Sequence, residues 1–267
     1  MKIFSKLNNQ QGFTLTELLI AIPLATLLTT VMIGTLFAQY TEVLAQSAKS
    51  NLRGQGQSLL INLQDELLFT IAYGEILDVG LVDPHQPSGG WSYNTSPQTL
   101  IINEIALDST RRDSDRHIVR QQLNPCETSP ITSNPVALNN VIYFIGDNPD
   151  SDFDTLYKRT ITPGYALCGI DSVTGDPCTV GVESTCDGNA KTTTCPADEV
   201  GTGGCTTKDF VLSENVSDLQ IRYFAENNVE TSIPSSADMI EVTMTLADRV
   251  YGKDVTVDVK HTIRKVN

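Results

Sequence analysis

The feature that most constrains the fold of this chain is an apolar run from Phe13 to Ala38, in which Glu17 is the only ionisable side chain. A helix of this length measures about 39 Å, because each residue adds about 1.5 Å. The hydrocarbon core of a bilayer is about 30 Å thick. The run therefore predicts one membrane-spanning helix with an acidic side chain near its start.

That acidic side chain needs a partner. A carboxylate inside a membrane helix costs about 2.5 to 3.5 kcal/mol on insertion scales unless a cation pairs with it. Cleavage of the chain between Gly12 and Phe13 would create such a cation, because the new α-amine of Phe13 would lie one helical turn from Glu17. We therefore expect the acid and a processed N-terminus to act together.

The segment Gly12-Phe13-Thr14-Leu15-Thr16-Glu17 resembles the N-terminus of the type IV pilin superfamily. The resemblance implies that residues 1–12 are a leader peptide, and that a prepilin peptidase cleaves after Gly12 and methylates the amine of Phe13. It also implies that Glu17 neutralises the N-terminus of a neighbouring subunit during assembly. The motif is specific, because a short basic leader, a glycine, an aromatic residue and a glutamate must coincide at the chain start.

Three other interpretations of the run compete with this one. A secretory signal has an apolar region of about 7 to 15 residues before a small-residue cleavage site. The present run is longer, and Leu36-Phe37-Ala38 is a poor site of that kind. A plain signal anchor would need neither Gly12 nor Glu17. A buried helix of a soluble protein would need other long apolar segments around it, and the rest of the sequence supplies none.

Charge limits the classes of partner. The chain has 18 Lys and Arg against 32 Asp and Glu, a formal net charge of −14. Such an acidic surface repels phosphate backbones, so we expect no nucleic acid as main partner. Lys2 and Lys6 precede the apolar run, and the next basic residue is Lys49. The positive-inside tendency then predicts that the leader stays cytoplasmic and that the bulk of the chain is exported.

Beyond Ala38 the chain turns polar but keeps a helical period. Leucines and Ile71 recur at spacings of three, four and seven residues, which predicts an amphipathic half of the helix over 39–77, ending near Tyr73-Gly74. We expect this stripe to pack on the chain's own head, with a groove for a partner helix as the alternative. Gly54 and Gly56 each cost about 1 kcal/mol relative to alanine, so we expect a bend or fraying there.

Residues 78–267 predict a β-rich globular head, because short apolar segments alternate with turn signals. Strands are expected at residues 99–105, 117–122, 141–145, 155–161, 209–212, 219–224, 239–246 and 255–263, with a hairpin turn at 248–254. The predicted fold class is therefore α+β. A long N-terminal helix, transmembrane over 13–38 and amphipathic beyond, packs on an antiparallel β-sheet.

All six cysteines lie in the part expected to be exported. An even number in an oxidising compartment predicts disulfides, although the sequence leaves their pairing open. A metal site would want closer cysteine and histidine spacing, so we expect none. The segment 163–208 is rich in Gly, Thr, Asp and Cys and has almost no large apolar residues. We interpret it as an inserted loop stapled by cysteines. The disulfide candidates are Cys126, Cys168, Cys178, Cys186, Cys195 and Cys205.

A group of four aspartates crowds one turn and begins like a calcium loop, since hard cations bind several carboxylate oxygens. An EF-hand needs Gly at the sixth position and Glu at the twelfth, where this chain has Thr155 and Ile161, so an EF-hand is excluded. An irregular calcium site and a solvated acidic turn both stay open, and no other cofactor is expected. The four are Asp147, Asp150, Asp152 and Asp154.

Catalytic patterns are lacking in the sequence. Neither Gly-x-Ser-x-Gly nor His-Glu-x-x-His occurs, and no phosphate-binding glycine loop follows a predicted strand. We assign no catalytic residues and expect that the protein is not an enzyme.

The head carries a second resemblance. The run Asn140-Val141-Ile142-Tyr143-Phe144-Ile145-Gly146-Asp147, followed by residues 156–159, is similar to a strand-turn-strand of the PilW-type minor pilins and of GspJ, the large minor pseudopilin of type II secretion. Residues 215–223 and the closing strand at 255–264 fit the same group. The resemblance implies a minor pilin that helps to initiate or assemble a type IV pilus. The alternatives are a minor pseudopilin of type II secretion and a membrane-anchored adhesin whose Cys-rich loop meets a surface.

The same resemblance implies where the protein is found and what it contacts. Before assembly it would cross the inner membrane once, with its head in the periplasm, and afterwards it would join a pilus or pseudopilus. The large head favours a place at the filament tip. The implied partners are other major and minor pilins or pseudopilins, the prepilin peptidase, the inner membrane and the inner-membrane assembly platform.

Overall fold

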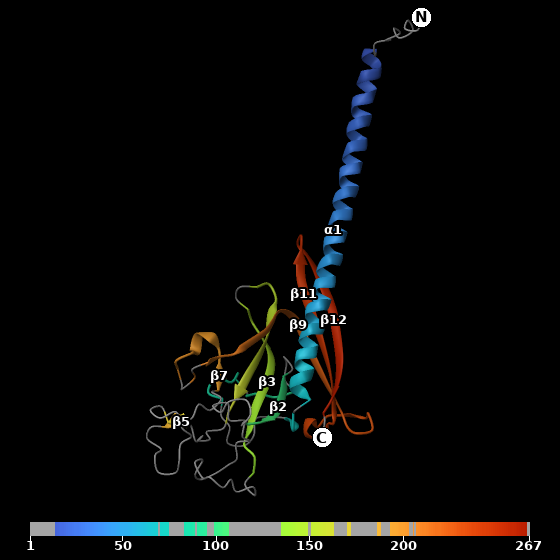
Figure 1. Ribbon diagram of the computed structural model, residues 1–267. Helices are drawn as coiled ribbons and strands as arrows, with labels where there is room; N and C mark the ends of the chain where they lie inside the picture. The colour runs from blue at the N-terminus through green and yellow to red at the C-terminus, as the bar shows by residue number, and fades with distance from the viewer. Residues whose placement is uncertain are drawn as a thin grey trace, which may run out of the picture.

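A computed structural model describes residues 14–68, 70–74, 83–88, 90–94, 99–106, 135–148, 151–162, 170–171, 186–187, 193–202, 205 and 207–265. A helix of 53 residues, α1 (Leu15–Leu67), lies against a large antiparallel sheet. Its C-terminal half packs on the sheet, and its N-terminal half extends away from the head (Figure 1). The predicted α+β, pilin-like fold class is confirmed.

The helix ends earlier than predicted. The N–H of Leu68 caps α1 by donating to the Gln64 carbonyl, and residues Ala72–Gly74 form strand β1. The predicted end near Tyr73-Gly74, and a helical range reaching residue 77, are therefore wrong. The physical reason is competition for backbone hydrogen bonds. The N–H of Ile71 donates to the Asn103 carbonyl at 3.0 Å, so the chain pairs with the sheet directly after its last helical turn.

The main sheet has the order β1-β2-β3-β4-β9-β11-β12, and every pairing in it is antiparallel. The short strand β10 adds to one edge of β9. The bounds are β2 (Leu100–Ile105), β3 (Leu138–Gly146), β4 (Asp154–Ile161), β9 (Phe210–Phe224), β10 (Glu230–Thr231), β11 (Met239–Val250) and β12 (Lys253–Arg264).

The strands match the sequence predictions at 99–105, 141–145, 155–161, 239–246 and 255–263 to within a few residues. The sequence predicts two strands at 209–212 and 219–224, whereas the structure has one, β9. Its first half pairs with β4 and its second half with β11, and Val216 is the residue at which the partner changes. The hairpin turn is also tighter than predicted, because Val250 already pairs with Lys253. The predicted strand at 117–122 lies outside the described residues.

The Cys-rich segment contributes short elements rather than a plain loop. Strands β5 (Ile170–Asp171) and β6 (Cys186–Asp187) pair antiparallel, and β7 (Thr194–Cys195) and β8 (Thr207–Lys208) pair parallel. Two 3-10 turns complete the described elements, η2 (Ala197–Glu199) and η3 (Pro234–Ser236).

The core lies between α1 and the sheet, and Gly56 sets how closely the two approach. The buried leucines of α1 pack with inward side chains of β9, β11 and β12. A Cβ atom on Gly56 would lie 2.8 Å from a methyl of Leu246 and from both methyls of Val259, whereas Gly54 faces open space. The expected bend is wrong, because α1 runs unbroken through both glycines. Gly56 is a contact point, not a weak point.

The two glycines give a matched pair of variants. We predict that Gly54→Ala raises the stability of the protein by up to about 1 kcal/mol, because alanine is the better helix former and meets no neighbour. We predict that Gly56→Ala lowers it by about 1 to 3 kcal/mol, because the added methyl overpacks the interface. Urea unfolding of the detergent-solubilised protein, followed by circular dichroism, measures both. Equal effects of the two substitutions would contradict the close approach at Gly56.

Candidate functional site

The N-terminal half of α1 is an exposed apolar rod. Every side chain from Thr14 to Val43 is exposed, and the large apolar ones are between 48 % and 83 % exposed. Contiguous apolar patches beyond a few hundred Å² are rare on soluble monomers and mark contact with lipid or protein. By length and composition, α1 is also the one helix in the described part of the chain that is able to cross a membrane.

Glu17 lies in the first turn of this rod and caps it. Its carboxylate Oε2 accepts from the Thr14 N–H at 3.0 Å and from the Thr14 hydroxyl at 2.8 Å, and the Glu17 N–H donates back to that hydroxyl at 3.4 Å. This reciprocal arrangement is a capping box, which satisfies donors left free at a helix start. The other oxygen, Oε1, has no hydrogen-bond partner among the described residues.

The carboxylate therefore has two capacities at once. One oxygen holds the helix start, while the second oxygen and the negative charge face outward from an exposed apolar surface. Gly12 and Phe13, the predicted processing site, lie outside the described residues. They directly precede Thr14 in the sequence, so a chain that began at Phe13 would place its amine beside this capping box.

Pro23 and the threonines of the rod do not interrupt it. The hydroxyls of Thr26 and Thr30 donate to the carbonyls of Pro23 and Thr26, each at 2.8 Å, and Thr29 bonds similarly to Ala25. These polar side chains are thus satisfied within the helix itself, as apolar surroundings require. The outward surface of the rod is consequently more apolar than its composition indicates.

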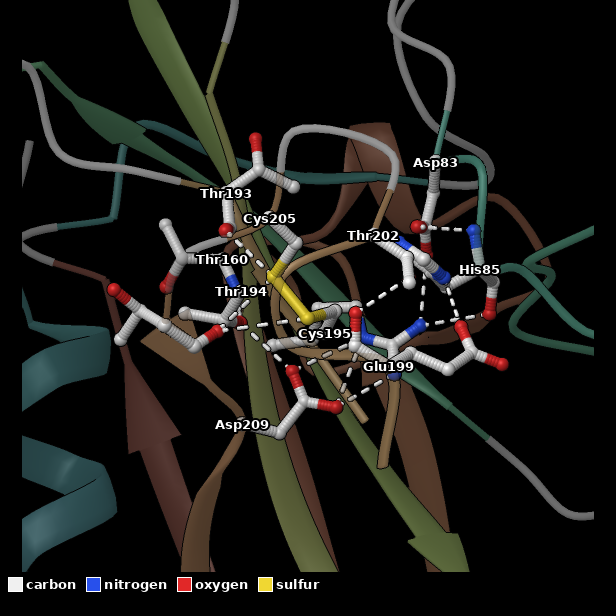
Figure 2. The surroundings of a disulfide bond; sticks show 12 residues. Asp83, His85, Thr160, Thr193, Thr194, Cys195, Glu199, Thr202, Cys205 and Asp209 are labelled. Atoms are coloured by element: carbon white, nitrogen blue, oxygen red, sulfur yellow. Dashed lines mark hydrogen bonds and ion pairs between the residues drawn. A yellow bond between two sulfur atoms is a disulfide. The ribbon is translucent and has the colours of Figure 1, made fainter. Parts of the chain in front are cut away.

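A disulfide fixes the side of the head that carries β7 and β8. Cys195 and Cys205 are bonded, with 6.2 Å between their Cα atoms, and threonines of neighbouring segments surround the bond (Figure 2). Cys126, Cys168 and Cys178 lie outside the described residues. Cys186 belongs to β6, but its side chain is not described.

Next to the disulfide, Arg159 of β4 is buried between two carboxylates. It bonds Asp83 at 2.9 Å and Asp209 at 2.6 Å, and all three side chains are at most 4 % exposed. Trp91 donates to Asp83 at 2.7 Å, and Thr194 donates to Asp209 at 2.8 Å. Burial acts to lower the pKa of Arg159, but its bonds with Asp209 and Asp83 outweigh burial and raise that pKa. The guanidinium therefore stays charged.

This buried cluster ties together segments that are far apart along the chain. Arg159 reaches Asp209 across 50 residues and Asp83 across 76. His85, on the same segment as Asp83, contacts Glu199 of η2, inside the loop that the disulfide closes (Figure 2). Sequence reasoning misses the cluster. Its only local signal is a single arginine inside a predicted strand, which does not identify the two acids.

Three of the four candidate calcium ligands lie in the described part of the chain. Asp152 forms an ion pair with Arg249 at 2.7 Å. Asp147 and Asp154 are described, while Asp150 lies outside the described residues. Within the described residues, no three His, Cys, Asp or Glu side chains converge in a way that would hold a metal ion.

Comparison with known proteins addresses the N-terminus. The family model for the prokaryotic N-terminal methylation motif matches residues 7–33, which include Gly12, Phe13, Glu17 and the start of the exposed rod. Among curated proteins, none matches the chain. The motif, the apolar helix and the antiparallel head agree with one another. The chain is a type IV pilin-like protein that carries the N-terminal methylation motif.

Proposed function

We propose that the protein is a minor pilin, which helps to initiate or assemble a type IV pilus through its N-terminal helix. One observation carries the proposal. The rod from Leu15 to Val43 is exposed, and Glu17 near its start is the only ionisable side chain as far as Ala38. Lipid covers this surface before assembly, and the helices of neighbouring subunits cover it in the filament.

Glu17 gives the packing its register. After cleavage behind Gly12, the methylated amine of Phe13 carries a positive charge at the depth of Glu17. A neighbour's amine meets the free Oε1, while Oε2 continues to cap the helix. In surroundings of low dielectric constant an unpaired charge is costly, so adjacent helices settle where acid and amine coincide.

The size of the head supports a place at or near the filament tip. The sheet and the disulfide-closed segment widen the molecule on one side of α1 (Figure 1). At a tip, such bulk does not obstruct helical packing on every side. The same packing would serve a minor pseudopilin of type II secretion, and identification of the co-assembling subunits distinguishes the two systems.

Processing is tested by mass spectrometry of the membrane fraction. We predict a chain that starts at methylated Phe13, because the leader peptidase cleaves behind Gly12. Replacing that glycine with a bulky residue, Gly12→Val, should leave residues 1–12 attached and prevent incorporation into filaments. A chain that keeps Met1, or one that starts after Ala38, would contradict the proposed processing.

The two capacities of Glu17 are separated by a pair of variants. Glu17→Gln keeps a side chain that supports a capping box but removes the charge. We predict that it lowers incorporation into sheared filaments at least tenfold, because a charge pair contributes about 4 kcal/mol at 4 Å and intermediate dielectric constant.

The control for that experiment is Thr14→Val, which removes the capping hydroxyl and keeps the charge of Glu17. We predict that it still assembles. Immunoblots of filament and membrane fractions measure both variants, and equal membrane levels show that insertion is intact. Normal assembly of the Glu17→Gln variant would refute the proposed pairing.

A further inference from the structure

The β11–β12 hairpin extends beyond the rest of the sheet. The pairing of β11 with β9 ends at Leu246, whereas its pairing with β12 continues to Val250. The tip of the hairpin points along α1 toward the N-terminal half of the helix, away from the C-terminus (Figure 1). The tip is therefore the part of the sheet that reaches toward the membrane side of the molecule.

Tyr251 occupies this tip in an unusual conformation. Its φ is 50° and that of Gly252 is 77°, a pair that fits the two-residue turns that favour Asn-Gly. A bulky side chain at positive φ is strained. The ring gains no burial in exchange, because Tyr251 is 72 % exposed. Residues held in such conformations cluster at functional surfaces, so the exposed ring calls for a contact outside the chain.

The position of the tip along α1, measured from Gly56 toward Ala38, indicates what that contact is. Gly56 marks the level at which α1 meets Leu246. From this level the strand rises about 16 Å to Tyr251, at about 3.3 Å per residue. The helix rises about 27 Å to Ala38, at about 1.5 Å per residue. The backbone of the tip thus lies about 11 Å short of the apolar run. The headgroup layer is about 5 to 8 Å deep on each side of a bilayer, so the gap between the tip backbone and this layer is about 3 to 6 Å, which a tyrosine side chain is long enough to span.

Two basic side chains lie at the tip among three acidic ones. Arg249 is engaged by Asp152 and Asp254, at 2.7 and 2.8 Å, which offsets part of their charge within the head. Asp248 accepts a bond from the backbone N–H of Arg249. Lys253 is exposed, and no ion pair joins it to another described residue. Tyrosine and lysine are both among the residues that anchor proteins at membrane–water interfaces.

We propose that the Tyr251–Lys253 tip contacts the lipid headgroups of the membrane surface. The inference rests on the proposed function, in which α1 is stored in the membrane before assembly. The tyrosine ring lies at headgroup level, and the Lys253 ammonium meets lipid phosphate. With α1 as one attachment and the tip as a second, the head is held in one orientation until the subunit is extracted.

The experiment places a fluorophore at the tip of the full chain. Tyr251→Trp keeps an aromatic ring at the turn. Val229→Trp is the matched control, because Val229 is 62 % exposed and lies beside β10, at the end of the sheet opposite to the hairpin tip. Trp91, the one native tryptophan, is buried and gives a constant background. Both variants are reconstituted in vesicles of phosphatidylethanolamine and phosphatidylglycerol that contain a headgroup-labelled quenching lipid.

We expect several-fold stronger quenching at position 251 than at position 229, and weaker quenching at 251 when Lys253→Ser is added. Equal quenching at the two positions, in protein that floats with the vesicles, would overturn the headgroup contact and leave the membrane helix standing. If the tryptophan at position 251 is quenched by a label on a second protein chain and not by the labelled lipid, the tip belongs to a subunit interface instead. Failure of the protein to float would overturn the proposed function itself.

Discussion

The structure depends on one constraint, which is that the head covers only the C-terminal half of the apolar surface of α1. From Ala45 onward the helix contacts the core, whereas its side chains before Val43 are exposed in the described structure. Removal of apolar surface from water is favourable by a free energy of about 25 cal/mol per Å². The second half of α1 achieves this by folding on the sheet. The first half achieves it against lipid or against other helices, and in the proposed function it does both in turn.

The covered half is fixed to the sheet by contacts of different kinds. Gly56 allows close approach to β11 and β12. Near the helix end, Glu66 accepts from the hydroxyl of Tyr143 and pairs with Lys158 at 2.7 Å, so it joins α1 to β3 and β4. Burial first, and then the neighbouring Glu66 charge, raise the pKa of Tyr143 well above its ordinary value. The tyrosine therefore remains a neutral donor across the physiological range of pH.

The farther side of the head relies on long-range pairing. The guanidinium of Arg159 is held between Asp83 and Asp209, and the disulfide closes the segment that ends at Cys205 beside them. Removing one partner of a buried charge leaves the other uncompensated, at a cost of about 3 to 5 kcal/mol. The cluster therefore specifies one arrangement of the loops around β4.

Sequence reasoning reached the features that local pattern determines. Glu17 and the apolar run are adjacent in the sequence, and the alternation in β11 and β12 is visible residue by residue. The errors occurred where tertiary contacts override local preference. Gly56 reads as a helix breaker until Leu246 and Val259 are seen beside it. Likewise, Tyr73 continues the helical pattern but pairs with Ile102 in the sheet. Nothing local identifies the acids that pair with Arg159.

The unbroken course of α1 turns the molecule into a lever. The free arm from Leu15 to Val43 is about 43 Å long, and its fulcrum is the point near Ala45 at which α1 leaves the core. A tilt of about 10° at that fulcrum would swing the far end by roughly 8 Å, more than one helical turn of about 5.4 Å. A small change in how the packed half of α1 sits on the sheet is thus enlarged at the carboxylate of Glu17.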